Sequence, residues 1–242
     1  HYRRLTVPRI LKKCRKIITV SHFERNRIRE ALNIPADRIT TIYNGYSRHF
    51  RPMDDIDMQI VNRYIPQKDF LFFLGNTDLK KNTARVLKAY SLYLEKSSVR
   101  RPLLIADLNE TYIDRLLQQE NISNRLKRHL FYPGYIHNAD LATLYNAAFT
   151  FLYPSLRESF GIPQLEAMAC GTPVVTSNTS AIPEVAGPGA ILVDPTSPTA
   201  IADALLRLET DPAFRAEQVA YGLERVKLFS WEETARQLLS LI

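Results

Sequence analysis

Long apolar runs and cysteine are scarce in this sequence of 242 residues. No apolar stretch approaches the roughly 20 residues that a membrane-spanning helix needs, and no charged-then-apolar signal segment opens the chain. The two cysteines, Cys14 and Cys170, are too few for a disulfide framework, so we expect both to be reduced and at least half-buried. The chain begins with His1 rather than Met, and we expect it to be a piece of a longer protein.

Several motifs are also missing, and each absence argues against a class of chemistry. No Gly-x-Gly-x-x-Gly follows the first long apolar run, which argues against a nicotinamide-dependent dehydrogenase. Acidic and histidine residues do not converge at metal-ligand spacing, so we expect no metal and no other cofactor. We expect no catalytic role for the histidines that fall in loops or on helix surfaces, which are His22, His49, His129 and His137.

Positive charge is concentrated at one end of the chain. Residues 1–50 hold 12 lysines and arginines against three acids, whereas the remaining residues hold 20 against 22. This asymmetry indicates either a solvated basic helix face or an anionic partner. Nucleic acid fits poorly because aromatic residues do not interleave with the charges, and an anionic membrane surface fits better. We therefore expect a cytoplasmic protein that binds no nucleic acid, with peripheral contact with the inner face of the membrane as one option.

From residue 70 onward, short β-branched or aromatic runs alternate with segments of helical period. This alternation predicts an α/β fold, in which a parallel sheet carries helices on both faces. The unbroken apolar run at 70–74 is typical of a strand buried on both sides. The expected strands are 70–74, 103–106, 130–132, 149–153, 173–176 and 190–193. The expected helices are 84–96, 112–119, 139–147, 163–169, 199–208, 213–227 and 231–241.

The first 50 residues differ from the rest. They predict helix, strand, helix and strand at 3–14, 17–20, 23–32 and 39–42, a piece too short to bury a good core alone. Residues 46–68 are polar and contain two prolines and three aspartates. We therefore divide the chain into four parts: the remnant of an N-terminal domain (1–45), an interdomain linker (46–68), the main α/β domain (69–228) and a C-terminal helix (229–242).

The candidate chemistry gathers in residues 153–178. A loop follows a strand there, Pro163 suits the first position of the next helix, and Gly171 caps the end of that helix. The helix N-terminus then points its free N–H groups at the carboxyl edge of the sheet, where α/β sheets bind ligands and a phosphate is favoured. Gly161 allows the backbone to approach such a ligand closely.

Two carboxylates bracket this helix N-terminus. Glu158 lies in the loop and Glu166 in the first turns of the helix. A carboxylate accepts hydrogen bonds from paired hydroxyls, so two of them beside a phosphate site suggest a sugar at each end of a diphosphate. The alternative is that both acids only stabilise the helix N-terminus by their charge.

A basic element follows the strand at 70–74. Residues 75–82 lead into a helix, and Lys80 and Lys81 lie at this second strand-to-helix junction, on the same edge of the sheet. A lysine there would neutralise a diphosphate that leaves as a bond breaks. Taken alone, the pair is a weak signal, because ordinary surface lysines are common.

The spacing Glu158-x7-Glu166, within its surrounding residues, resembles the signature of the family 4 retaining glycosyltransferases. Further resemblances cover nearly the whole chain, at 20–21, 42–46, 72–75, 81–82, 132–136, 183–187, 193–195 and 229–231. They imply a GT-B type fold of two facing Rossmann-like domains, of which this chain holds the nucleotide-sugar-binding one and the tail of the acceptor-binding one. The Lys-Lys-Asn form at 80–82 is most similar to the mannosyltransferase-like branch.

The resemblance also assigns roles by position. It implies that Glu166 binds the nucleotide ribose, that Glu158 binds hydroxyls of the donor sugar, and that Lys81 neutralises the diphosphate. Glu158 and Lys81 are thus the catalytic candidates. The sugar or the distal phosphate would be held by the backbone N–H groups of Phe160, Gly161 and Ile162.

Tyr135 and Ile136 would line the pocket for the base. In the first phosphate loop, Gly75 matches the family, but the arginine that usually follows is Asn76 here. That departure puts one diphosphate contact in doubt, and we expect Lys80 to compensate for it.

The resemblance implies transfer of a hexose, mannose by subgroup, from a GDP- or UDP-sugar to a glycan or lipid-linked acceptor in polysaccharide or cell-envelope biosynthesis. The anomeric configuration would be kept without a metal or other cofactor. We expect this chain alone to bind the donor without transferring sugar. Two other classes stay open: a domain that binds nucleotide sugars without turnover, and a sugar-nucleotide epimerase of the same architecture.

The end of the chain predicts a capped helix, because Ser230-x-x-Glu233 forms a capping box. In two-domain transferases of this type the last helix crosses back to the N-terminal domain. We therefore expect residues 231–242 to pack on residues 1–45, which leaves the basic face of residues 3–16 free. The contact would use an apolar stripe at helical spacing, made of Ala235, Leu238, Leu239 and Ile242.

Overall fold

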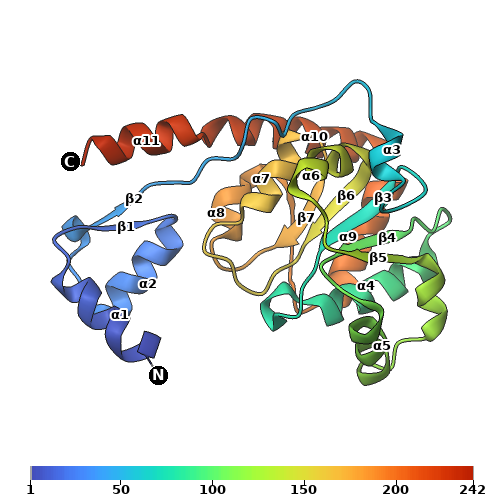
Figure 1. The fold of residues 1–242 in the computed structure, drawn as a ribbon, viewed down its shortest axis with the longest axis horizontal. Helices are drawn as coiled ribbons and strands as arrows, with labels where there is room; N and C mark the ends of the chain where they lie inside the picture. The colour runs from blue at the N-terminus through green and yellow to red at the C-terminus, as the bar shows by residue number, and fades with distance from the viewer. Residues whose placement is uncertain (1, 242) are drawn as a thin grey trace.

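The computed structural model describes residues 2–241, which form two units of different size (Figure 1). The larger unit is built on a parallel sheet of six strands in the order β5-β4-β3-β6-β7-β8. The strands are β3 (Phe70–Leu74), β4 (Leu103–Ala106), β5 (Leu130–Gly134), β6 (Ala148–Tyr153), β7 (Val174–Ser177) and β8 (Ile191–Val193). The predicted α/β fold and its six strands are confirmed, and each strand end lies within two residues of the expected position.

Helices cover both faces of the sheet, as its unbroken apolar strands require. The buried cluster on one face is completed by α4 (Thr83–Lys96), α5 (Glu110–Gln119) and α9 (Pro198–Thr210). The opposite cluster is completed by α6 (Asn138–Ala147), α7 (Ile162–Ala169) and α8 (Ile182–Ala186). Helix α10 (Pro212–Arg225) packs against α7 and α9. All of these helices except α8, whose five residues are too few to show a helical period, are predicted by the sequence.

The strand order reverses between β3 and β6. The chain runs outward from β3 through β4 and β5, and then returns to pair β6 with the other edge of β3. In sheets of this order the ligand binds outside the carboxyl ends of the strands at this reversal. Residues 75–82 leave β3 there and residues 154–161 leave β6, so the two segments with candidate chemistry meet at one place.

The small unit comprises α1 (Tyr2–Lys13), β1 (Ile17–Thr19), α2 (His22–Leu32) and β2 (Ile39–Thr41). Strands β1 and β2 pair in parallel, and Ile17, Ile34 and Ile39 form the buried cluster. Figure 1 shows this unit beside the larger one, joined to it by an extended segment that follows β2. A cluster of this size stabilises little by itself, so the unit depends on its contacts with the rest of the chain.

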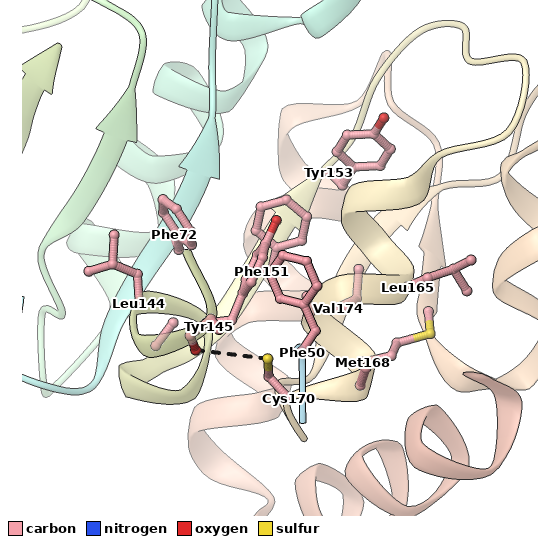
Figure 2. Packing of buried hydrophobic residues seen from close by; sticks show 14 of the residues in the cluster. Phe50, Phe72, Leu144, Tyr145, Phe151, Tyr153, Leu165, Met168, Cys170 and Val174 are labelled. Atoms are coloured by element: carbon pink, nitrogen blue, oxygen red, sulfur yellow. Dashed lines mark hydrogen bonds between the residues drawn. The ribbon is translucent and has the colours of Figure 1, made fainter. Parts of the chain in front are cut away.

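The polar segment at 46–68 is partly built into the larger unit. Helix α3 (Met58–Val61) packs against α6, and Phe50, Val61 and Ile65 are buried. Figure 2 shows Phe50 within the apolar cluster, where its ring centroid lies 5.8 Å from that of Tyr145. A helix of four residues with a few isolated apolar side chains carries too little periodicity to be seen in the sequence.

The last helix, α11 (Trp231–Leu239), contacts the segment that follows β2 through its first turn. Ser230 pairs with Tyr46 in a parallel bridge, and the Thr234 hydroxyl donates to the Tyr43 carbonyl at 2.6 Å. One half of the expected capping box is present, since the Ser230 hydroxyl accepts from the Glu233 N–H at 3.1 Å, whereas the Glu233 carboxylate accepts from Arg236. The contact is polar and local because α11 meets an extended segment rather than a helix face.

The predicted apolar stripe is wrong as the contact surface of α11. The side chains of Leu238 and Leu239 are 38% and 71% exposed, and Ala235 is also exposed. Ile242 lies outside the described residues. The stripe points into solvent because α11 extends past the larger unit, as Figure 1 shows, and reaches the small unit only through the extended segment.

Gly45 makes the close approach between these segments possible. A Cβ at this position would lie 2.2 Å from the Trp231 backbone N, so we expect Gly45→Ala to displace α11 and destabilise the fold by about 1–3 kcal/mol. Trp231 is the single tryptophan of the chain and is 45% exposed, so its fluorescence reports the position of the helix. Thermal unfolding and the emission spectrum check the prediction.

The matched control is Ser47→Ala, two residues away at an exposed site. It should leave both the Tm and the tryptophan emission unchanged. A Gly45→Ala variant with native emission and native Tm would show that the approach is looser than described.

Candidate functional site

The loop between β6 and α7 ends in a glycine with a backbone that other residues rarely adopt. Gly161 has φ 101°, and a Cβ there would lie 2.8 Å from the side-chain nitrogen of Gln164. Pro163 occupies the first turn of α7, where a missing N–H does no harm. The remaining free N–H groups of this turn open toward the carboxyl edge of the sheet, and together with the helix dipole they suit a phosphate.

Glu166 lies one turn further along α7 and is half-buried. Its carboxylate accepts one long hydrogen bond, from the Tyr145 hydroxyl at 3.4 Å. Burial raises the pKa of Glu166 from 4.5 to about 7, and the bond from Tyr145 opposes this only in part. Among residues 2–241, Tyr145 is the donor that this half-buried carboxylate has, so its oxygens could also accept from the two hydroxyls of a ribose.

The two catalytic candidates are paired with each other. The Lys81 ammonium lies 2.9 Å from a Glu158 carboxylate oxygen, and each side chain is only 16% exposed. The same ammonium lies 4.9 Å from the centre of the Tyr153 ring, a distance at which a cation–π attraction operates. Burial and the nearby Glu158 carboxylate raise the pKa of Tyr153, so this phenol stays neutral.

Asn82 fixes the geometry of this pair. It is 3% exposed, has a left-handed backbone at φ 68°, and donates its amide to the carbonyls of Pro154 at 2.9 Å and Pro195 at 2.7 Å. The Leu156 N–H also donates to the Lys80 carbonyl at 2.7 Å. The loops after β3 and β6 are thereby held together by hydrogen bonds. The sequence identifies Asn82 only as part of a motif and does not reveal this bridging role.

The other predicted residues of the first phosphate loop have local partners. Gly75 is buried, and Lys80 is exposed and pairs with Asp78 at 3.3 Å. The Asn76 side chain accepts from the Asp78 N–H at 2.8 Å, so it shapes the loop in place of reaching outward. Contacts of Gly75, Asn76 and Lys80 with a diphosphate remain predictions.

The predicted base-pocket residues lie at the end of β5. Tyr135 is 64% exposed, whereas Ile136 is 4% exposed with its side chain in the core. Only the backbone of Ile136 can therefore face a ligand. The neighbouring Gly134 carbonyl accepts from the Asp107 N–H at 2.7 Å, which ties this loop to the end of β4.

Phe160 also contributes its side chain to the core, where its ring centroid lies 5.8 Å from that of Phe229. Any contact of Phe160 with a ligand is thus through its N–H group, as for Gly161 and Ile162. The structure brings Glu158, Lys81, Glu166 and the first turn of α7 to one edge of the sheet, with Tyr135 on the loop after β5. Their roles toward a ligand stay predictions at this point.

Two family models match the chain. The model described as "Glycosyl transferases group 1" matches residues 57–225, and the model described as "Glycosyltransferase Family 4" matches residues 1–49. The chain is 35% identical to the O-antigen chain mannosyltransferase B of Escherichia coli over 232 residues, which cover 95% of this chain and 61% of that protein. It is 29% identical to the serotype-specific mannosyltransferase WbdA of Escherichia coli, over 90% of this chain and 27% of that protein.

Solved structures agree with these matches. Sucrose-phosphate synthase from Thermosynechococcus elongatus superposes with a TM-score of 0.81 at 26% identity, over 97% of this chain and 59% of that one. HepE from Anabaena, solved with UDP and glucose, gives a TM-score of 0.81 at 16% identity, over 98% of this chain and 65% of that one. These neighbours confirm the GT-B type fold expected from the sequence, and the chain spans less than two thirds of each of these four proteins. Matched by the family model over more than two thirds of its length, this chain belongs to the group 1 glycosyl transferases.

Proposed function

We propose that this chain is the donor-binding part of a retaining hexosyltransferase. The donor is a nucleotide diphosphate sugar, and the longer protein passes the hexose to a hydroxyl of a glycan or lipid-linked acceptor in polysaccharide biosynthesis. One observation carries the proposal: the Glu166 carboxylate is half-buried and, among residues 2–241, accepts a single long hydrogen bond, one turn inside a helix whose N-terminus lies at the strand-order reversal. A ribose next to a diphosphate would give hydrogen-bond partners to both the Glu166 carboxylate and the N–H groups at the start of α7.

The four parts of the domain division are retained within this proposal. Residues 1–45 are the tail of the acceptor-binding domain, 46–68 the connection, 69–228 the nucleotide-sugar-binding domain and 229–242 the returning helix. The two family models meet between residues 49 and 57, which supports a boundary in that segment.

The reaction is a displacement at the anomeric carbon. The bond from this carbon to the diphosphate oxygen breaks, a bond to the acceptor oxygen forms on the same face, and the acceptor proton passes to the leaving diphosphate. Negative charge grows on the diphosphate, where Lys81 and the first N–H groups of α7 would lie. Fixed donors in a partly buried site stabilise such charge strongly, and no metal or protein nucleophile is needed.

We propose mannose as the hexose, because both relatives from Escherichia coli are named mannosyltransferases. The base is guanine or uracil; the complex of HepE with UDP and glucose is a precedent only at the level of the fold. A thermal-shift comparison of GDP-mannose, GDP, UDP-glucose and UDP decides between them, since the ligand that binds the native state more tightly raises the Tm more.

The first prediction concerns Glu166 and the ribose. Glu166→Gln should weaken binding of the nucleotide sugar by about 1.5–3 kcal/mol, because a charged acceptor is lost. With a pKa of about 7, the wild-type carboxylate is mostly protonated at pH 6 and mostly ionised at pH 8. Hydroxyl donors favour the ionised form, so affinity should rise up to about tenfold over this range, with release of a proton on binding. Calorimetry with the intact sugar nucleotide, which has no phosphate that titrates near pH 7, measures both effects.

The Tm of Glu166→Gln shows whether weaker binding results from a loss of folding. The folded-state pKa lies above the ordinary value, so the stabilising contribution of Glu166 is complete below about pH 4.5 and lost as the pH rises through 7. Glu166→Gln removes this loss, so its Tm should match or exceed that of the wild type at pH 8. An affinity that is independent of pH in the wild type would contradict the assignment.

The second prediction distinguishes a residue that binds the sugar, Glu158, from one that binds the diphosphate, Lys81. Glu158→Gln should leave the affinity for the bare nucleoside diphosphate unchanged or slightly raised, because Lys81 is released from its ion pair. The same change should weaken binding of the sugar nucleotide by about 1.5–3 kcal/mol, because the contacts of Glu158 with the sugar hydroxyls are lost. Lys81→Met should weaken both ligands, since both contain the diphosphate.

Lys80→Met is the comparison for Lys81→Met, because Lys80 is the second lysine expected at the diphosphate but is exposed and already pairs with Asp78. Its effect on both ligands should be smaller than that of Lys81→Met. Equal losses for the bare nucleotide and the sugar nucleotide in Glu158→Gln would argue against a contact between Glu158 and the sugar.

A separate proposal concerns α1 and anionic membranes. Leu5, Val7 and Ile10 are 57%, 42% and 53% exposed, and Lys12 and Lys13 are exposed on the same helix. No helix within residues 2–241 is long and apolar enough to cross a bilayer. Apolar and basic side chains together favour peripheral contact with acidic lipids.

Liposome sedimentation tests this contact. Binding should require acidic lipid and be lost at about 1 M salt, where the Debye length falls to about 3 Å. The double variant Lys12→Glu/Lys13→Glu should lose binding, whereas the matched reversal Arg100→Glu/Arg128→Glu in the larger unit should retain it. Equal binding to neutral vesicles would refute the proposal.

A further inference from the structure

The loop that follows β6 belongs to the larger unit and also contacts the small unit. The buried Ser21 hydroxyl donates to the Ser159 carbonyl at 2.8 Å, and the Ser159 hydroxyl lies 3.1 Å from a Glu24 carboxylate oxygen. Arg157 approaches the same Glu24 oxygen at 3.4 Å. Two residues of the loop, Arg157 and Ser159, are thus bound to the start of α2.

A carboxylate from α8 completes this contact. Glu184 accepts from the N–H groups of His22 at 2.7 Å and Phe23 at 2.9 Å, which are free donors of the first turn of α2. It also accepts from the Tyr43 hydroxyl at 2.9 Å. Burial and this bond raise the pKa of Tyr43 to about 12, so the donor stays protonated at neutral pH. A negative charge at a helix N-terminus is favoured, so the two units are docked in one orientation.

Aromatic packing extends the contact to Phe160. The ring centroid of Tyr43 lies 5.9 Å from that of Phe160 and 5.6 Å from that of Phe229. Phe160 is the residue before Gly161, where α7 begins. The position of its N–H group therefore depends on a side chain that comes from outside the larger unit.

The loop has no regular secondary structure, so its shape is set by these contacts. On one side the Glu158 N–H donates to the Ser180 hydroxyl at 3.1 Å, and on the other Ser159 is held by α2. Glu166, by contrast, lies inside α7 and contacts Tyr145 of α6. The small unit thus touches the part of the site assigned to the sugar and not the part assigned to the ribose.

We infer that the first turn of α2, through Ser21 and Glu24, positions the sugar-binding loop of the donor site. These are positioning residues, because they act on Glu158 through the neighbouring Ser159. The inference rests on the proposed function. It adds that affinity for the sugar end of the donor depends on the docking of the small unit, whereas affinity for the nucleotide end does not.

The experiment compares two ligands in single variants of this chain. Glu24→Ala and Ser159→Ala should each lower the affinity for the sugar nucleotide about five- to tenfold. Both should leave the affinity for the bare nucleoside diphosphate within about twofold of wild type. The probes are GDP-mannose with GDP and UDP-glucose with UDP, measured by calorimetry. The double variant should lose no more than Glu24→Ala alone, because the hydrogen bond that Ser159→Ala removes is already absent in Glu24→Ala. Glu24→Gln, which keeps an acceptor for the Ser159 hydroxyl, should recover most of the loss.

The matched control is Glu30→Ala, which removes the same charge from the exposed end of α2. Hydrogen exchange over residues 155–162 without ligand should be faster in Glu24→Ala and unchanged in Glu30→Ala. If Glu24→Ala bound the sugar nucleotide as tightly as Glu30→Ala does, the inference would be overturned and the proposed function would stand. The same holds if Glu24→Ala lost equal affinity for the sugar nucleotide and the bare nucleotide. A wild-type chain that binds neither nucleotide nor sugar nucleotide would overturn the proposed function itself.

Discussion

The pairing of β3 with β6 is the constraint on which the rest of the site depends. The two strands are separated by more than 70 residues in the sequence, yet they lie side by side and parallel. Their following loops therefore emerge at the same edge, where Asn82 bridges them and Lys81 meets Glu158. Without this adjacency the lysine after β3 would be an ordinary surface residue, and α7 would present its N–H groups to water alone.

The elements of this arrangement are readable from the sequence because each has a local physical cause. The β3 strand is apolar without interruption because both of its faces are covered. Gly171, at φ 75°, adopts the left-handed turn that ends α7, as its position predicts. That Lys81 lies at the same edge of the sheet as Glu158 also follows, since parallel strands bring their carboxyl ends to one edge, but their direct pairing does not. The resemblance to the family 4 glycosyltransferases then predicts a nucleotide sugar as the ligand, which hydrophobic periodicity alone does not indicate.

What the sequence does not reveal depends on contacts between distant segments. Nothing local indicates that Ile136 turns its side chain into the core, that Asn76 is occupied by its own loop, or that Glu184 accepts the N–H groups of α2. The stripe on α11 shows the opposite failure. Helical spacing of apolar residues indicates a face that could be covered, but it does not say what covers it, and Leu239 stays exposed.

Glu166, the residue proposed to bind the ribose, shows how a binding role can oppose the stability of the fold. A shift of its pKa from 4.5 to about 7 corresponds to a cost on the order of 3 kcal/mol for holding the charge in the folded protein at alkaline pH. The same desolvation strengthens each hydrogen bond that a ligand hydroxyl makes to the ionised carboxylate. Neighbours on α7 such as Leu165 and Met168 are fully packed, so the helix tolerates this cost. A carboxylate that burial disfavours, and that its hydrogen bond from Tyr145 stabilises only in part, therefore supports the proposed contact with a ribose.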